Sequence, residues 1–321
     1  MKILLTHSPE ASKLYYGERA LAGLKRLGEV KENRNPSSLE GEALIVAAAD
    51  CDLIVSYRQS PASSALFERL PELKAFLRCA IDIRNVDVAA ASKAGVLVTQ
   101  ASAGFVTSVS ELVIGFLVDL ARGITRSATM YHGKKIPGAQ TGRELKGSTL
   151  GVIGYGAIGR EVARIARAMG MRVLIHDPYV KGIEQTGLEA LLEESDFVAP
   201  LAVANAETEN LMDENAFARM KRGAYLINVS RGNLVDEGAL EAALDSGHLA
   251  GCAMDVGRAA DQMPSPRLAA RADVIATPHT AGLTLPAIEH QSLETVAQAA
   301  EIIQGRVPRG AVNAEHWKRK P

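Results

Sequence analysis

The chain has 321 residues, 47% of them hydrophobic and 23% charged, which is long enough for about two domains with their own cores. Its 36 basic residues nearly balance 37 acidic ones and only 4% are aromatic, which argues against a surface for nucleic acid or anionic membranes. Three widely separated cysteines form no CxxC pair, and we expect no bound metal. The N-terminal apolar run is too short for a signal peptide and no run is long enough to span a membrane, so we expect a cytoplasmic protein.

The first third of the chain alternates short apolar runs with helical segments. Strands are expected at Lys2–Thr6, Asp52–Val55, Lys74–Leu77 and Val96–Thr99, with a helix at Ala11–Leu27 after the first of them. Short apolar runs separated by helices are typical of parallel strands that are covered on both faces. This part of the chain therefore predicts an α/β unit.

The rest of the chain predicts a second α/β unit. An apolar helix is expected at Thr107–Arg122, and the stretch His132–Gly147 that follows has no clear periodicity. The alternation then restarts, with strands expected at Thr149–Ile153, Arg172–His176, Phe197–Pro200, Tyr225–Val229, Gly251–Val256 and Val274–Thr277. A final helix is expected at Leu285–Gly305. Because no Gly/Ser-rich linker separates the two units, we expect helices to join them.

A glycine-rich turn lies between the predicted strand that ends at Ile153 and a predicted helix. It reads Gly154, Tyr155, Gly156, Ala157, Ile158, Gly159, and the next strand leads to Asp177, 23 residues after the first glycine. In this context the glycines permit a tight turn, close approach to a pyrophosphate and close helix–strand packing. The helix N-terminus adds free N–H groups for the phosphates. The turn therefore predicts a dinucleotide site.

Asp177 indicates which dinucleotide is bound. Its carboxylate would accept hydrogen bonds from both ribose hydroxyls and would repel a 2′-phosphate. The neighbouring residues His176, Pro178 and Tyr179 include no arginine that would bind such a phosphate. The cofactor is therefore expected to be NAD rather than NADP.

Several short motifs occur in a characteristic order along the chain. They are Asn85–Asp87, Gly95–Val98, Ser108–Glu111, Glu144–Gly147, Gly154–Gly159, Ile227–Gly232 with Val235–Asp236, Gly251–Val256 and Thr277–Gly282. In this order and spacing the sequence resembles the D-isomer-specific 2-hydroxyacid dehydrogenases, and especially their phosphoglycerate dehydrogenase-like members.

The resemblance implies an architecture and an activity. A Rossmann-type parallel-sheet NAD-binding domain, residues 99–285, would be inserted into a smaller flavodoxin-like α/β substrate domain, residues 1–98 plus 286–321. The protein would be a homodimer formed largely through the NAD-binding domain. As an oxidoreductase it would transfer a hydride between the nicotinamide and a 2-hydroxy or 2-keto acid.

The resemblance also implies two catalytic residues. Arg231 would hold the substrate carboxylate and carbonyl, and His279 would donate and accept the proton. These residue types suit the roles, because a planar guanidinium binds a carboxylate through two parallel hydrogen bonds and an imidazole titrates near neutral pH. Considered alone, each residue could be an ordinary solvated or packed side chain; the surrounding motifs favour the catalytic roles.

The sequence departs from the family pattern at the partner of the catalytic histidine. Family members carry a glutamate that pairs with the histidine, and Ala260 stands at that position here. Without a carboxylate there, the protonated form of His279 loses a favourable neighbour. Asp82, Asp255 or Asp261 could supply the missing charge, although the resemblance also counts Asp255 among the cofactor-binding residues.

A second departure lies in the predicted substrate-binding loop, Ala80, Ile81 and Asp82. In the family, backbone N–H groups of this loop bind the substrate carboxylate, and glycines stand where this chain has Ala80 and Asp82. The carboxylate of Asp82 would repel a substrate carboxylate docked beside it. Either the loop is rearranged or the substrate is different.

Three functions are consistent with these observations. The first is an NAD-dependent dehydrogenase of 2-hydroxy acids that is atypical at Ala260. The second is an enzyme of the same fold that acts on another class of substrate, and the third is an NAD-binding protein without catalytic activity. Retention of both Arg231 and His279 argues against the third, because a non-catalytic protein needs neither.

Overall fold

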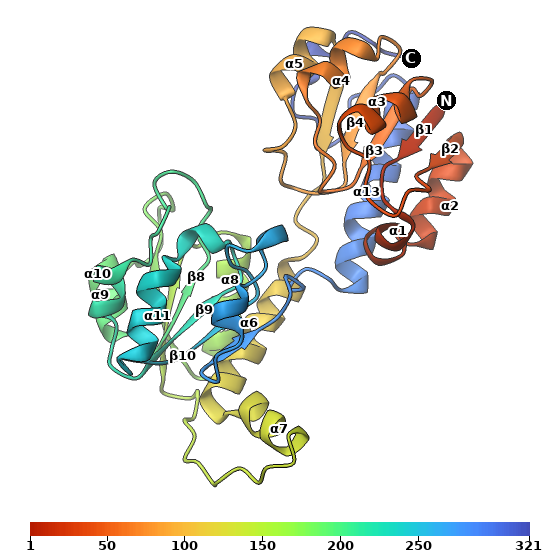
Figure 1. The fold of residues 1–321 in the computed structure, drawn as a ribbon. Helices are drawn as coiled ribbons and strands as arrows, with labels where there is room; N and C mark the ends of the chain where they lie inside the picture. Colours follow the sequence, from red (N-terminus) through yellow and green to blue (C-terminus); the bar gives the residue numbers. More distant parts are fainter. The chain divides into compact units, whose positions relative to one another are not determined.

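The computed structural model describes residues 1–321, which form two compact units. The first unit comprises Met1–Phe105 together with Leu283–Pro321, and the second comprises Val106–Gly282 (Figure 1). One stretch of chain is thus inserted into the other.

These limits differ by a few residues from the boundaries expected at 98/99 and 285/286. The backbone N–H of Gln100 donates to the carbonyl of Gly310 at 2.9 Å, and that of Ser102 donates to the Glu294 carboxylate at 2.7 Å. These bonds hold the segment after the last strand of the first unit to that unit, so the first division falls later than expected, after Phe105, whereas the second falls slightly earlier, before Leu283.

The first unit contains a five-stranded parallel sheet with the order β2-β1-β3-β4-β5. Its strands are β1 (Lys2–Leu5), β2 (Glu29–Glu32), β3 (Leu53–Ser56), β4 (Ala75–Arg78) and β5 (Leu97–Gln100). This order is that of flavodoxin-like folds. Strand β2 was not predicted, because this edge strand reads EVKE and lacks the apolar run that marks the other four.

Six helices accompany this sheet. They are α1 (Pro9–Tyr15), α2 (Glu18–Leu27), α3 (Gly41–Ala48), α4 (Ser64–Arg69), α5 (Val88–Ala94) and α13 (Leu285–Ile303). The single helix expected at Ala11–Leu27 is wrong: Gly17, with φ of +85°, separates α1 from α2. The long α13 returns to this unit, where Thr99 Oγ1 donates to the Gln298 side chain at 2.7 Å.

The second unit contains a six-stranded parallel sheet with the order β11-β10-β9-β8-β6-β7. Its strands are β6 (Thr149–Ile153), β7 (Arg172–His176), β8 (Phe197–Pro200), β9 (Ala224–Asn228), β10 (Leu249–Met254) and β11 (Val274–Ala276). From β6 the chain passes to β7 on one side and then returns to β8 on the other side, so the strand order reverses between β6 and β8. Rossmann-type sheets bind dinucleotides at this switch point.

Seven helices accompany the second sheet. They are α6 (Val106–Arg122), α7 (Ile124–His132), α8 (Ala157–Ala168), α9 (Leu188–Glu194), α10 (Glu214–Arg219), α11 (Glu237–Asp245) and α12 (Pro266–Ala269). Helix α7 has no buried residue and projects with its following loop away from the sheet (Figure 1). Helix α7 was not predicted from the sequence, and its apolar side chains Ile124 and Tyr131 are exposed instead of packing on the sheet.

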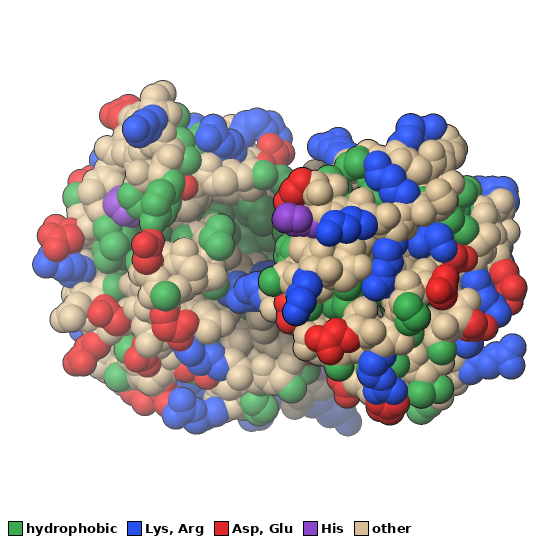
Figure 2. Space-filling view, turned by 90° about the horizontal axis from the view of Figure 1, so that it is seen from above, with side chains coloured by type: hydrophobic (Ala, Val, Ile, Leu, Met, Phe, Trp, Pro, Cys, Tyr) green, Lys and Arg blue, Asp and Glu red, His purple; other side chains and the backbone are tan.

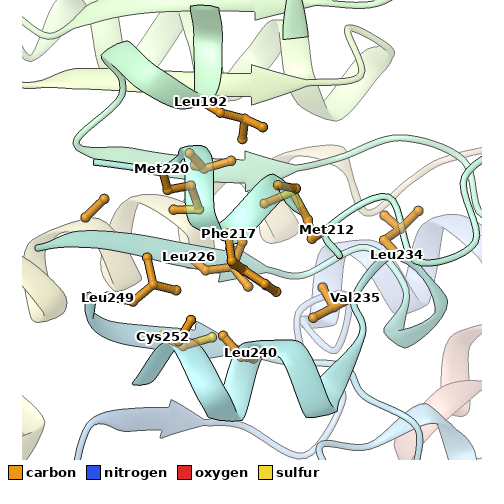
Figure 3. Packing of buried hydrophobic residues seen from close by; sticks show 14 of the residues in the cluster. Leu192, Met212, Phe217, Met220, Leu226, Leu234, Val235, Leu240, Leu249 and Cys252 are labelled. Carbon is orange, nitrogen blue, oxygen red and sulfur yellow. The ribbon is translucent and has the colours of Figure 1, made fainter. Parts of the chain in front are cut away.

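The core of the second unit is formed by side chains from its sheet and from α9, α10 and α11. Phe217 of α10 is 1% exposed and lies among Leu226 of β9, Leu240 of α11 and Cys252 of β10 (Figure 3). Burial of these apolar side chains stabilises the sheet whose carboxyl edge carries the candidate site.

Charged side chains of both signs are interspersed over the visible surface of each unit (Figure 2), as a net charge of −1 would suggest. None of the helices combines the length and the apolar character that crossing a membrane requires. Histidine, cysteine and acidic side chains form no group that could hold a metal ion.

Candidate active site

The predicted site residues of the second unit lie at one edge of its sheet. Arg231 follows β9, Asp255 follows β10 and His279 follows β11, and these strands are neighbours. The ladder continues past the strand ends, since the Asp255 N–H donates to the Asn228 carbonyl at 2.9 Å. Because carboxyl ends of parallel strands share an edge, the fold brings these three residues to the edge that also carries the glycine-rich turn.

The three glycines of the turn meet three different requirements. Gly154 has φ of +98°, and a Cβ there would lie 2.6 Å from the Ala202 nitrogen. A Cβ on Gly159 would lie 2.2 Å from the Gly154 carbonyl oxygen, so this glycine lets α8 pack on the turn. A Cβ on Gly156 would meet nothing within 4 Å. The turn therefore presents open backbone at Gly156, as close approach of a pyrophosphate requires.

The start of α8 offers further groups to a phosphate. Gly156 is its N-cap, and the backbone N–H groups of Ala157 and Ile158 donate to no acceptor in this unit, as is usual in a first helical turn. The helix dipole favours an anion at this end. The guanidinium of Arg160 lies 4.7 Å from the centre of the Tyr155 ring and adds an exposed positive charge beside the turn. These groups fit a dinucleotide.

Asp177 follows β7, and its carboxylate reaches the glycine-rich turn. One oxygen accepts from the Tyr155 N–H at 2.7 Å and the other from the Tyr179 N–H at 3.0 Å. A carboxylate oxygen accepts more than one hydrogen bond, so both retain capacity for hydroxyl donors.

A second carboxylate, that of Glu207, lies near Asp177 and was not predicted. The Tyr179 hydroxyl donates to Glu207 from the loop after β8, and this bond raises the pKa of Tyr179. The link joins two loops at the carboxyl edge of the sheet. No sequence motif could have indicated it, because the two residues are 28 positions apart and occur in no characteristic pattern.

The backbone around Arg231 is held by neighbouring polar groups. The buried Asn228 side chain donates to the Arg231 carbonyl at 3.0 Å and accepts from the Ser230 N–H at 3.1 Å. Ser230 Oγ donates to the Ala202 carbonyl at 3.0 Å, which ties this loop to the one beside Gly154. Arg231 itself is half-buried. A half-buried guanidinium on a loop that hydrogen bonds hold in place is suited to binding an anion.

Asp255 binds the backbone that follows β11. Its side chain is fully buried, and its carboxylate accepts from Thr277 Oγ1 at 2.6 Å, the Thr280 N–H at 2.8 Å and the Ala281 N–H at 2.9 Å. Its carbonyl accepts from the His279 N–H at 2.9 Å. Asp255 therefore holds the segment that carries His279, and its carboxylate does not pair with the imidazole.

The His279 ring is held by a backbone group. Its Nδ1 atom lies 2.7 Å from the carbonyl oxygen of Asp261, and no carboxylate oxygen of the second unit hydrogen-bonds to the ring. Ala260 is exposed at the start of a short 3-10 turn, Ala260–Gln262. Of Asp82, Asp255 and Asp261, the residue that contacts the ring is Asp261, through its backbone carbonyl.

The substrate loop predicted in the first unit follows β4. The Ala80 carbonyl accepts from the Ala101 N–H at 3.0 Å, whereas the N–H groups of Ala80 and Ile81 donate to no acceptor in this unit. The Asp82 carboxylate accepts from Arg84 Nη2 at 2.6 Å and from Arg84 Nε at 3.0 Å. This pair raises the pKa of the Arg84 guanidinium and compensates the charge of Asp82. The like-charge repulsion expected from Asp82 is thereby reduced.

Arg78, at the end of β4, holds this loop through hydrogen bonds to backbone carbonyls, a role that was not predicted. It is 2% exposed and donates to the carbonyls of Tyr57 at 2.7 Å, Ser60 at 3.1 Å and Asp82 at 3.1 Å. Burial lowers the pKa of Arg78 to about 10, and the group remains a cation at neutral pH. A buried charge is stable when carbonyl oxygens surround it in this way.

The chain is similar to known proteins in sequence and in structure. Residues 114–281 match the model of the D-isomer specific 2-hydroxyacid dehydrogenase NAD-binding domain. D-3-phosphoglycerate dehydrogenase 3 of Arabidopsis thaliana chloroplasts is 34% identical over 282 residues, which cover 85% of this chain and 48% of that protein. Glyoxylate reductase of Korarchaeum cryptofilum is 32% identical over 324 residues, which cover 95% of each chain.

The fold is also similar to that of a solved structure. The NAD-complexed D-isomer specific 2-hydroxyacid dehydrogenase of Lactobacillus delbrueckii ssp. bulgaricus has a TM-score of 0.80 and 25% identity, covering 98% of this chain and all of that one. The chain spans about half the length of the phosphoglycerate dehydrogenases that it matches.

The fold and the glycine-rich turn define a dinucleotide-binding α/β protein of the Rossmann class. More specifically, the chain belongs to the D-isomer specific 2-hydroxyacid dehydrogenase family, and its second unit contains the family's NAD-binding domain.

Proposed function

We propose that the protein is an NAD-dependent oxidoreductase that interconverts a 2-keto acid and a D-2-hydroxy acid. The observation that carries this proposal is the placement of Arg231 after β9 and of His279 after β11, the strands on either side of β10, at the sheet edge that holds the cofactor turn. An anion-binding cation and a proton-transferring imidazole beside a nicotinamide are the groups that reduction of a keto acid needs.

Arg231 is proposed to bind the substrate carboxylate. Its guanidinium offers parallel N–H donors that match a carboxylate in two places, which orients the keto carbon as well as attracting the charge. The backbone N–H groups of Ala80 and Ile81, which donate to no acceptor in their own unit, are proposed to contribute to substrate binding.

His279 is proposed to transfer the proton. Its Nδ1–H donates to the Asp261 carbonyl, so Nε2 is the atom that exchanges a proton with the substrate oxygen. During reduction the protonated ring donates to the carbonyl oxygen, and during oxidation the neutral ring accepts from the hydroxyl. Bound NADH supplies the hydride.

Asp177 is proposed to select NAD over NADP. Its carboxylate already binds the turn through the Tyr155 N–H and retains capacity for the ribose hydroxyls, whereas a 2′-phosphate would meet its negative charge. Asp255 is proposed to act on the site only indirectly, through the segment that it holds. The preference for NAD that is assigned to Asp177 is tested by measuring the dissociation constants of NADH and NADPH.

The protein is proposed to act as a cytoplasmic homodimer that needs no nucleic-acid or membrane partner. Exposed apolar side chains on and after α7, Ile124, Tyr131 and Ile136, support an interface formed by the NAD-binding domain. The three cysteines are buried free thiols, which supports a reducing compartment.

A second candidate is an enzyme of this fold that acts on a substrate other than an ordinary 2-hydroxy acid. The Asp82–Arg84 pair favours it, because it places both charges in the loop where the family binds a carboxylate through backbone alone. A substrate with an additional polar group would use this pair.

The experiment that separates these functions follows NADH absorbance with a panel of keto acids: hydroxypyruvate, glyoxylate, pyruvate and phosphohydroxypyruvate. Oxidation of NADH by at least one of them supports the first function. If NADH binds tightly and none of them is reduced, the dehydrogenase proposal fails for ordinary 2-keto acids, and the other substrate class or a non-catalytic role takes its place.

A further inference from the structure

The hydrogen bond to His279 determines which ring nitrogen carries hydrogen. Nδ1 lies 2.7 Å from the Asp261 carbonyl oxygen, and a carbonyl oxygen can only accept. Nδ1 therefore carries hydrogen in both protonation states, and Nε2 alone gains or loses the proton. A carbonyl does not titrate, so the imidazole is the only member of this pair that changes charge.

The Asp261 carbonyl is presented by a short closed loop, Gly257–Pro264. The Gly257 N–H donates to the Gln262 carbonyl at 2.8 Å, and the Ala259 N–H donates to the Met263 carbonyl at 3.0 Å. A Cβ on Gly257 would lie 2.7 Å from Pro264 Cα, so the two ends of the loop are in direct contact. The loop has little freedom to move its carbonyl groups.

Arg258 anchors this loop to the body of the second unit. Its guanidinium donates to Asn210 Oδ1 at 2.5 Å and to the carbonyls of Asn233 and Val235, each at 3.2 Å. It also forms an ion pair with Glu209 at 2.9 Å. These acceptors lie in two different connecting segments, so one side chain holds three stretches of backbone together.

Backbone strain is concentrated at the same place. Five non-glycine residues have positive φ: Lys134, Asn210, Asp261, Gln262 and His279. Asp261 and Gln262 belong to the loop, Asn210 accepts a hydrogen bond from Arg258, and His279 is the residue that the loop contacts. Asparagine and aspartate tolerate a left-handed conformation, so the strain lies at Gln262 and His279. Such strain persists where the surroundings impose it, typically at functional sites.

We propose that the Gly257–Pro264 loop is a positioning element for His279 and that Arg258 is its positioning residue. The loop replaces the carboxylate that orients the histidine elsewhere in the family with a rigidly held backbone carbonyl. The consequence for catalysis rests on the proposed function, whereas the consequence for the state of the imidazole does not.

Nitrogen NMR of the ¹⁵N-labelled full chain tests the first consequence. At a pH where the imidazole is neutral, long-range ring correlations should show hydrogen on Nδ1 and a pyridine-type Nε2 for His279. The chain has seven histidines, and the His279 signals are identified by their loss in His279→Gln. Hydrogen on Nε2, or an even mixture of the two tautomers, would overturn the proposal.

Paired variants test the loop and its anchor. Asp261→Val disfavours the left-handed backbone, whereas Asp261→Asn retains it and removes only the carboxylate. Arg258→Met removes the anchor, and Arg258→Lys restores a donor. We expect the valine and methionine variants to lose the Nδ1–H signature and to lower kcat on the order of 10- to 100-fold, with the asparagine and lysine variants rescuing it.

Lys134→Val is the matched control, because it changes another left-handed residue that lies outside the Gly257–Pro264 loop and its anchor. It should leave the His279 spectrum and kcat unchanged. Loss of the signature in Asp261→Asn would show that the carboxylate is the partner and would overturn the proposal. So would a wild-type spectrum in both Asp261→Val and Arg258→Met. If Asp261→Val does not fold, the wild-type spectrum and the Arg258 pair decide.

The spectra and the NADH dissociation constant need no turnover, so the two proposals fail separately. A chain with the Nδ1–H signature that reduces no keto acid would refute the proposed function alone. A chain that reduces keto acids but carries hydrogen on Nε2 would refute the positioning element alone.

Discussion

The carboxylate of Asp255 accepts three hydrogen bonds from the segment that carries His279, and its side chain has no exposed surface. Asn228 acts in the same way on the loop of Arg231. Both candidate catalytic side chains thus stand on backbone that buried polar residues hold in place. This arrangement limits the motion of Arg231 and His279.

Arg231→Lys should impair keto-acid reduction although it conserves the charge. Lysine loses the fork that binds a carboxylate through two hydrogen bonds, so kcat/KM should fall about 10- to 100-fold while the dissociation constant of NADH stays unchanged. Arg222→Lys, at an exposed arginine of the same unit, is the control. Equal turnover of Arg231→Lys and the wild type would show that Arg231 does not hold the substrate.

Ala260→Glu should extend reduction to higher pH. A carboxylate near His279 favours the protonated imidazole, which reduction requires, so the alkaline limb of the kcat/KM profile should move upward by about one pH unit. The limb for oxidation, which requires the neutral ring, should move in the same direction. Ala270→Glu adds the same charge at another exposed position and is the control. An unmoved profile, or equal shifts in both variants, contradicts the account.

At the scale of elements, the unit β6–turn–α8–β7 joins local packing to cofactor binding. Gly159 contacts the Gly154 carbonyl, and Gly156 faces open space. One glycine of the turn therefore serves the fold, and another serves the ligand.

Two alanine substitutions should separate these roles. Gly156→Ala should leave the free energy of unfolding unchanged and weaken NADH binding on the order of tenfold or more, because its methyl group occupies the approach of the pyrophosphate. Gly159→Ala should also lower the free energy of unfolding by about 1–3 kcal/mol, because the turn must shift. Urea unfolding and NADH titration measure both. Equal stability losses in the two variants would contradict this division.

Elements with strong apolar patterns could be predicted from the sequence, and weakly patterned ones could not. The runs that became β6–β11 were located to within two residues, because a buried parallel strand must be apolar throughout. The polar edge strand β2 was missed for the converse reason, and the exposed α7 was missed as well.

The same distinction holds for the site. The glycine-rich turn and Asp177 have a residue signature, and the structure brings them together. The Asp261 carbonyl that holds His279 has none, since every residue carries a carbonyl and only the path of the loop decides which one faces the ring.

At the scale of the whole molecule, the first unit carries a titratable group that the site does not use. His7 is 1% exposed, its ring lies 5.0 Å from that of Tyr16 and 4.9 Å from that of Tyr57, and neither ring nitrogen has a hydrogen-bond partner. Burial, with a smaller contribution from Arg78, lowers the pKa of His7 to about 3. The folded state therefore holds this imidazole neutral.

The first unit should consequently lose stability in mild acid. The unfolded chain takes up a proton at His7 near pH 6.5 and the folded chain does not, so the free energy of unfolding should fall by about 1.4 kcal/mol per pH unit below about pH 6. His7→Leu should flatten this slope, whereas exposed His132→Leu in the other unit should not. Fluorescence of the single tryptophan, Trp317, which is buried in the first unit, follows the transition. An equally steep slope in His7→Leu would exclude His7 as its cause.

The central claim is hydride transfer to a keto acid held by Arg231 and protonated by His279. The most direct test supplies NADH with deuterium in both positions at nicotinamide C4, together with the keto acid that turns over best, and analyses the product by mass spectrometry and chiral chromatography. We predict one deuterium at carbon 2 of a D-2-hydroxy acid for each NADH consumed, and much slower formation of this product in His279→Gln and Arg231→Lys. Unlabelled product, the L-isomer, or undiminished labelling in both variants would contradict the account.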